Sequence, residues 1–211
     1  PAGKSFKGMI MWAGRLTGPT VVPGNYKVQL TVGDQVQEQN FEILKDPRSE
    51  SSLEDMQAQF TFLKEVVDKS SEAHQAIIDI RDIRTQIKTY TDKLKDDDKM
   101  EDVLKKAKSI TKSMTEVEET LYQTKNRSRQ DPLNFPIKLT NKLAHLNSLN
   151  GSGDFRPTAQ SYAVKEELTQ QIDKALKKFR KVVNEEVPEL NRMIRERAVD
   201  PIMMKEKPPV N

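Results

Sequence analysis

Apolar positions recur at steps of three and four over a long central stretch of the chain. With Ser70 and His74 at two of its positions, the series runs through Leu53, Met56, Phe60, Leu63, Val67, Ile77, Ile80, Ile83, Ile87, Tyr90 and Leu94. This period predicts one amphipathic helix of about forty residues, roughly 60 Å long. Ser51-Ser52-Leu53-Glu54 fits a capping box at its start. The step from Ile77 to Ile80 repeats a three, so the heptad phase slips there.

Three further helices are expected after this one. The next has a regular heptad, with Met100, Val103, Ala107, Ile110, Met114, Val117 and Leu121. We expect Asp98 to cap it, with Glu101 at the third position. A short helix is predicted over residues 137–149, before the stop at Asn150-Gly151-Ser152-Gly153-Asp154.

Pro157-Thr158 opens the last long helix. Its apolar side carries Tyr162, Val164, Leu168, Ile172, Ala175, Phe179, Val182, Val183, Val187, Leu190 and Ile194. We expect Pro188 to kink or restart this helix, because proline lacks the backbone N–H. The tail from Pro201 is expected to fray.

Residues 1–48 follow a different pattern, with a period of two. After the turn signal Pro23-Gly24, apolar side chains alternate with polar ones along residues 26–32, which predicts a half-buried strand. Gly33-Asp34 turns the chain into a second strand that reaches Ile43, which completes an antiparallel hairpin. Met9 to Trp12 is a candidate earlier strand. Two or three strands are only marginally stable by themselves. They therefore need either further strands upstream or the helices to pack on.

The fold class predicted from these patterns is mainly α. We expect an antiparallel bundle of three long helices plus one short helix (49–200), preceded by a β-hairpin that is the remnant of a β-sandwich domain (1–48), and followed by a flexible tail (201–211). A long homodimeric coiled coil is the competing architecture. The phase slip and Pro188 favour the bundle, because a dimeric coiled coil prefers an unbroken repeat.

Composition narrows the functional classes. Lys and Arg number 35 against 32 Asp and Glu, so a net charge of +3 gives no electrostatic footprint for nucleic acid or for an anionic membrane surface. The absence of cysteine excludes disulfides and thiolate chemistry. No apolar run approaches the length of a membrane span, and no signal peptide is visible. Because the chain begins at Pro1 rather than Met, we expect a fragment or a processed form.

Catalytic constellations are not evident. Gly3-Lys4-Ser5 lacks the upstream glycine and strand of a phosphate loop, and Asp96 to Asp98 lacks the spacing of a calcium loop. We expect His74 to form a polar layer in the bundle, satisfied by a facing side chain, and His145 to have a surface or packing role. The sequence therefore predicts no catalytic residue, no metal site and no cofactor, and this chain is interpreted as not an enzyme.

Four residues are candidates for interaction. Arg81 and Arg84 interrupt the apolar stripe of the first helix, where they can cover apolar surface and pair with Asp82 or with a carboxylate on a neighbouring helix. Trp12 is either an anchor in the core of the β-part or an exposed platform for a sugar or partner. Tyr26 is the fourth candidate, as a further ring of such an exposed platform.

Several segments, in order, resemble one family. They are Pro23 to Val32 (PGNYKVQLTV), Asp46-Pro47-Arg48, Ile80 to Gln86 (IRDIRTQ), Pro136 to Leu146 (PIKLTNKLAHL), Arg156 to Tyr162 (RPTAQSY) and Val187 to Asn191 (VPELN). Together they are similar to the C-terminal region of large secreted bacterial proteins with BNR (Asp-box, sortilin-like) β-propellers, often described as glycosyl hydrolases. The resemblance implies an extracellular or periplasmic location and a propeller upstream that would carry any glycosidase site. No Asp-box repeat stands in this chain, so no catalytic residue is carried over.

Three functions remain open at this point. The first is a structural and interaction module that caps, spaces or docks the upstream propeller. The second is a homo-oligomerising coiled coil that presents the β-part to a protein partner. The third is a carbohydrate-binding or carbohydrate-active domain with a glycan partner, which requires exposed rings at Trp12 and Tyr26 beside carboxylates.

Overall fold

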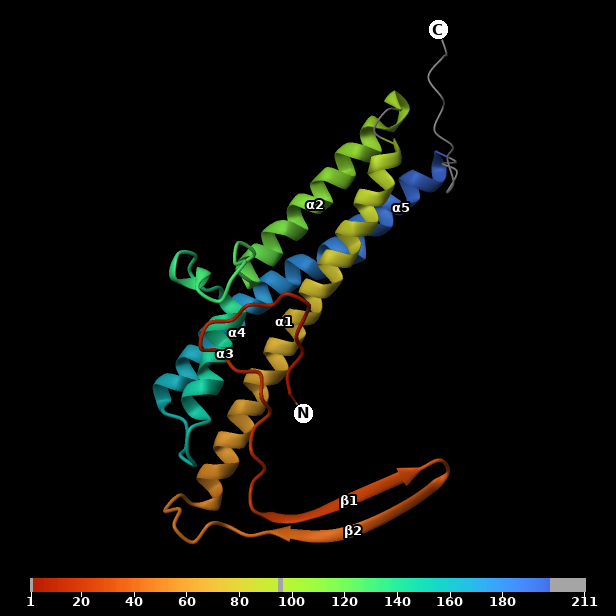
Figure 1. Cartoon of the computed structure of the whole chain (residues 1–211). Helices are drawn as coiled ribbons and strands as arrows, with labels where there is room; N and C mark the ends of the chain where they lie inside the picture. Colours follow the sequence, from red (N-terminus) through yellow and green to blue (C-terminus); the bar gives the residue numbers. More distant parts are fainter. Residues whose placement is uncertain (1, 95–96, 198–211) are drawn as a thin grey trace.

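The chain forms an elongated helical bundle with a β-hairpin that projects from one end (Figure 1). The computed structural model describes residues 2–94 and 97–197. Helix α1 (Leu53–Leu94) runs the whole length of the bundle, and α2 (Glu101–Leu121) and α3 (Leu139–Asn150) cover its two halves in turn. A continuous helical rod, α4 (Ala159–Lys181) and α5 (Val187–Glu196), completes the bundle. The predicted mainly helical class is confirmed.

Helix α1 has 42 residues, close to the predicted length. Its cap lies one residue later than predicted: Ser52 Oγ accepts from the Asp55 N–H at 3.0 Å, and Asp55 Oδ2 accepts from the Ser52 hydroxyl at 2.6 Å. The prediction of a box from Ser51 to Glu54 was therefore wrong by one position. Aspartate can replace glutamate here because its shorter side chain still reaches back to Ser52.

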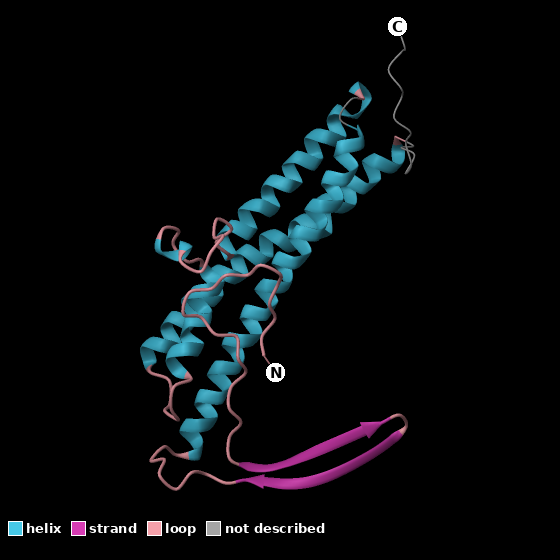
Figure 2. Cartoon of the chain, viewed as in Figure 1, coloured by secondary structure: helices cyan, strands magenta, loops and turns pink. Residues whose placement is uncertain are grey.

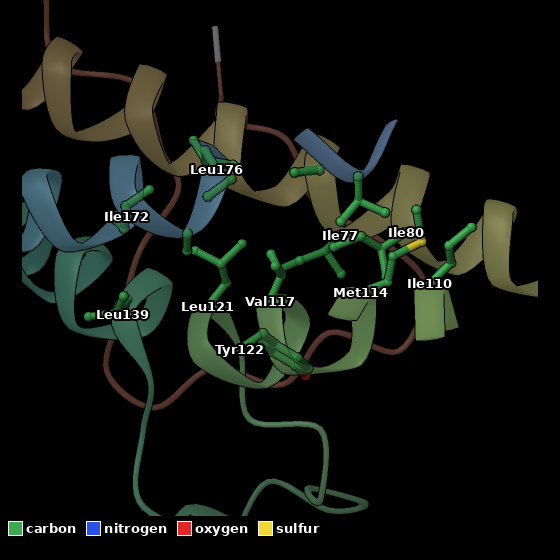
Figure 3. Packing of buried hydrophobic residues seen from close by; sticks show 14 of the residues in the cluster. Ile77, Ile80, Ile110, Met114, Val117, Leu121, Tyr122, Leu139, Ile172 and Leu176 are labelled. Atoms are coloured by element: carbon green, nitrogen blue, oxygen red, sulfur yellow. The ribbon is translucent and has the colours of Figure 1, made fainter. Parts of the chain in front are cut away.

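A single apolar core joins all the helices. Figure 3 shows Ile77 and Ile80 of α1 among Ile110, Met114 and Val117 of α2. The phase slip at Ile77 and Ile80 falls where α1 exchanges one neighbour for another, with α3 before it and α2 after it. Each half of α1 thus presents its stripe to a different helix, which a change of phase permits.

The other helix ends follow the predicted signals with one adjustment. The 3₁₀ turn Asp98–Met100 before α2 has Asp97 as its N-cap, whose side chain accepts from the Lys99 N–H at 3.0 Å, instead of the predicted Asp98. Thr158 caps α4 as expected, accepting from the Ser161 N–H at 3.1 Å. A π-helical turn, Val182–Glu186, separates α4 from α5 just before Pro188. This is the interruption predicted at the proline. The predicted tail 201–211 lies outside the described residues.

Strands β1 (Gly24–Val32) and β2 (Gln35–Ile43) form the predicted hairpin. They pair in register from Gly24 with Ile43 to Val32 with Gln35, and Gly33 makes the turn with a φ of +58°. The predicted strand at residues 9–12 was wrong. This segment belongs instead to a loop that crosses the helices (Figure 2), because the N–H groups of Ile10 and Trp12 donate to the side chains of Tyr122 and Asn141 and not to a neighbouring strand.

Candidate interaction surface

The two faces of the hairpin differ in chemistry. Residues paired directly across an antiparallel ladder lie on the same face. One face, here called the apolar hairpin face, consists of Tyr26, Val28, Leu30, Val32 and Phe41, with glutamines opposite the aliphatic side chains. The other face carries Asn25, Lys27, Gln29, Thr31, Val36, Glu38, Asn40 and Glu42.

The apolar hairpin face is open to solvent. The exposed fractions are 53% for Val28, 60% for Leu30, 66% for Val32 and 46% for Phe41. The prediction of a half-buried strand was therefore wrong for these residues, because the hairpin projects away from the bundle (Figure 1). Contiguous apolar side chains on one face of a soluble element are characteristic of an interaction surface.

Local contacts give the hairpin its shape without covering this face. The rings of Tyr26 and Phe41 lie 5.9 Å apart across the strands, and the Tyr26 hydroxyl donates to the carbonyl of Val22. On the polar face, Lys27 pairs with Glu38 at 2.7 Å. Cross-strand contacts of this kind stabilise register. The hairpin is thus a defined shape that presents one apolar surface.

The exit from the hairpin is a self-contained turn. Asp46 accepts from the Arg48 backbone N–H at 2.9 Å, and its two carboxylate oxygens accept from the Arg48 guanidinium at 3.1 and 2.8 Å. These hydrogen bonds hold the pKa of Asp46 below its usual value. Pro47, between them, ends the ladder. The Asp-Pro-Arg segment therefore fixes the path of the chain from the hairpin toward α1.

Arg81 and Arg84 are partly exposed and form ion pairs between α1 and α2. Glu118 of α2, only 2% exposed, accepts from Arg81 Nε at 2.7 Å and from an Arg84 nitrogen at 2.5 Å. Arg84 also donates to the Thr115 hydroxyl at 2.8 Å. The guanidinium of Arg81 lies 4.5 Å from the centre of the Phe6 ring. Both arginines thus join α1 to α2, and their interaction with an outside partner stays a prediction.

The structure separates the two aromatic candidates. Trp12 is 40% exposed on the loop that crosses α3, where its backbone N–H and carbonyl both bond to Asn141. Its place on the helices, outside the hairpin, does not match the predicted role of an anchor in a β-core. Tyr26 is half-buried in the hairpin. Among the described residues, no ring contact joins Trp12 to Tyr26, and the carbohydrate-binding reading stays a prediction.

The two histidines have structural surroundings. His74 is fully buried, and its Nδ1 lies 2.7 Å from the backbone carbonyl of Lys4, so this nitrogen carries the proton and donates. The partner is a backbone group, whereas a facing side chain was predicted. Burial lowers the pKa of His74 below its ordinary value. His145 is half-buried on α3.

An apolar hollow of about 290 Å³ lies between α1, α2 and α5, far from the hairpin. Ile83, Ile87, Val103, Leu190 and Ile194 are among its lining residues. In the part of the chain that the structure describes, no three His, Cys, Asp or Glu side chains gather as a metal site requires. None of the helices described there combines the length and apolar character of a membrane span.

Comparisons with protein-family models, with curated proteins and with solved structures found no match for this chain. The site is therefore interpreted from its own chemistry. Alternation of apolar and polar residues revealed the hairpin in the sequence. No signal in that pattern showed that the apolar face would lack a cover, since the pattern is the same whether or not another layer packs on it.

Proposed function

We propose that this chain is a non-catalytic structural and interaction module, the C-terminal part of a larger secreted protein with a BNR propeller upstream. In this proposal the apolar hairpin face docks on a β-rich surface of the same polypeptide, and the bundle is the rigid support behind it. The supporting observation is the exposure of Val28, Leu30, Val32 and Phe41 on one face of a hairpin.

The open apolar face bears on the stability of the hairpin. An isolated two-stranded hairpin is marginal in water, and a third strand or an apolar layer against its face stabilises it. Burial of apolar surface contributes about 25 cal/mol per Å², and the polar opposite face needs no cover. The partner that fits is therefore a second apolar sheet surface, as in the two-layer β-sandwich that the resemblance implies.

Hydrogen exchange tests this function directly. The amides of residues 24–43 should exchange rapidly in the chain alone and at least tenfold more slowly in a longer polypeptide that contains the upstream domain. Leu30→Glu should abolish the protection. Thr31→Glu is the matched control, since its side chain lies on the polar face one residue away and should leave protection intact.

Two results would contradict the proposal. One is equal exchange of the hairpin in the short and long polypeptides. The other is a full-length protein sequence in which the part before this chain contains no propeller. If the hairpin were protected in the chain alone, in a manner that depends on protein concentration, the partner would be a second copy, which is the oligomerisation alternative.

A further inference from the structure

Residues 3–17, here called the strap, form a loop that crosses α1 and α3 before the hairpin begins. Figure 2 shows this loop lying over the helices. Its ends are tied together where the Gly3 N–H donates to the carbonyl of Leu16 at 2.6 Å. Between these ends the strap forms no ladder with another strand. The Arg15 N–H donates to the Ala144 carbonyl of α3, the Met9 N–H donates to the Phe6 carbonyl, and several other backbone groups bond to side chains of the bundle.

Helix α3 binds the backbone of the second half of the strap. Asn141 accepts from the Trp12 N–H and donates to the Trp12 carbonyl, both at 2.7 Å. Asn147 donates to the carbonyls of Arg15 and Thr17 at 3.1 and 2.9 Å. Both asparagines are buried. A primary amide that holds the N–H and the C=O of one residue binds main-chain atoms regardless of the side chain that this residue carries.

The first half of the strap is bound in the same way. Its partners are two side chains of α1 and Tyr122, which follows α2. Ser71 accepts from the Lys4 N–H at 2.9 Å, and His74 donates to the Lys4 carbonyl at 2.7 Å. The hydroxyl of Tyr122 accepts from the Ile10 N–H at 2.8 Å. Three more polar side chains of the bundle thus bond to main-chain atoms of the strap.

One aromatic side chain of the strap enters a shaped socket. Phe6 meets the rings of His74 and Tyr122 edge to face, at centroid distances of 5.4 and 5.0 Å, beneath the Arg81 guanidinium. Closer to α3, a Cβ on Gly14 would stand 3.0 Å from the Cβ of Ala144, so the backbone approaches the helix closely there. The socket adds side-chain selectivity to backbone recognition.

We infer that this surface is a binding site for a looped peptide, with the strap as its occupant in the same chain. The binding site consists of Ser71, His74, Tyr122, Asn141 and Asn147. Its ligand class is a peptide loop with an aromatic anchor six residues before the amide-bound position, as Phe6 precedes Trp12, and with a turn at Gly8 between them. Main-chain hydrogen bonds with one anchoring pocket are the usual basis of peptide recognition. This inference does not depend on what the hairpin docks on.

A cut in the covalent link tests whether the strap behaves as a ligand. A specific protease site is inserted between Thr20 and Val21, which are exposed, and the purified full chain is cleaved. The strap piece should remain bound to the rest of the chain through gel filtration and in native mass spectra. An excess of synthetic peptide of residues 2–17 should exchange with it, while the helical circular dichroism stays unchanged.

Substitutions in the strap leave the binding site unaltered, which makes them clean probes. Phe6→Ala should weaken retention of the cleaved strap about tenfold or more, and Lys7→Ala, at an exposed neighbour, should leave it unchanged. Equal release of both variants, or immediate loss of the unsubstituted strap, would overturn the inference. Collapse of the helices after cleavage would also overturn it, because the strap would then be part of the core and not a ligand.

Discussion

The helical bundle and the hairpin come from one chain, yet they handle apolar surface in opposite ways. In the bundle, Ile77, Ile80 and Leu121 are fully buried, and the stripes of successive helices cover one another. In the hairpin, Leu30 and Val32 are mostly exposed, although they alternate with polar residues as buried side chains do. The bundle therefore covers its own apolar surface, whereas the hairpin leaves one apolar face open, and the proposed function assigns that face to a partner surface.

Polar residues reinforce this contrast. The bundle buries Glu118, His74 and Asn141, and each makes a hydrogen bond to a distant part of the chain. The second ring nitrogen of His74, Nε2, has no such bond among the described residues. Buried polar groups without partners are costly, so such contacts specify one arrangement of the helices. The ion pair of the hairpin, Lys27 with Glu38, is exposed, and such pairs contribute little to stability.

The largest loss of stability is expected when a core side chain of the bundle is truncated. Ile77→Ala removes a fully buried side chain, and we expect a loss of about 3 kcal/mol in the free energy of unfolding. Urea denaturation followed by circular dichroism measures it. A loss below about 1 kcal/mol would show that the α1–α2 contact is not a well-packed core.

The next effect concerns the ion cluster between α1 and α2. Glu118→Ala leaves Arg81 and Arg84 without their buried carboxylate, and because both arginines are partly exposed we expect a loss of about 2 kcal/mol. Thermal melts compare this variant with Glu116→Gln, which removes only a surface pair with Lys178 and should change stability little. Equal effects of the two substitutions would contradict the structural role of Glu118.

A pH-dependent effect should follow from His74. Its folded-state pKa lies below the usual value of 6.5, so the unfolded chain binds more protons as pH falls through 6.5. The free energy of unfolding should therefore decrease on acidification, by at most about 1.4 kcal/mol per pH unit, until the pH drops below the folded-state pKa.

Unfolding measured between about pH 5 and 7.5 keeps most carboxylates ionised. His74→Asn should remove this pH dependence, and His145→Asn, at the other histidine of the chain, should retain it. A slope that persists in the His74→Asn variant would assign the effect to other groups.

The smallest effect is expected in the hairpin. Leu30→Ala should change the unfolding free energy of the chain by less than about 0.5 kcal/mol, because the side chain is 60% exposed and contacts no core. Chemical denaturation of the chain alone provides the value. A loss comparable to that of Ile77→Ala would mean that the hairpin folds back on the bundle in solution.

Local patterns predicted most of the helices. The period of the apolar residues located α1 and α2 to within a few residues, and Thr158 and Pro188 marked the start and the interruption of the last rod. Capping was less exact, since Ser51 and Ser52 both fit a cap and the structure uses Ser52. Neighbouring residues of the same type cannot be distinguished by sequence alone.

The strap and the open hairpin face could not be predicted from such local patterns. Residues 9–12 have the composition of a strand, and their partners Tyr122 and Asn141 lie more than a hundred positions away. Likewise, the alternation at Val28 and Leu30 predicts one apolar face but does not indicate whether another part of the protein covers it. Both features depend on tertiary contacts, which override local preference.

The most direct test of this contrast between a complete bundle and an open hairpin is sedimentation equilibrium of the Leu30→Glu variant over a wide concentration range. We expect a monomer of 24.2 kDa with the helical content of the unsubstituted chain, since the charge removes any association through the hairpin and the helices bury their apolar stripes within one chain. A stable dimer of this variant would contradict it, because the helical stripes would then be buried between two chains.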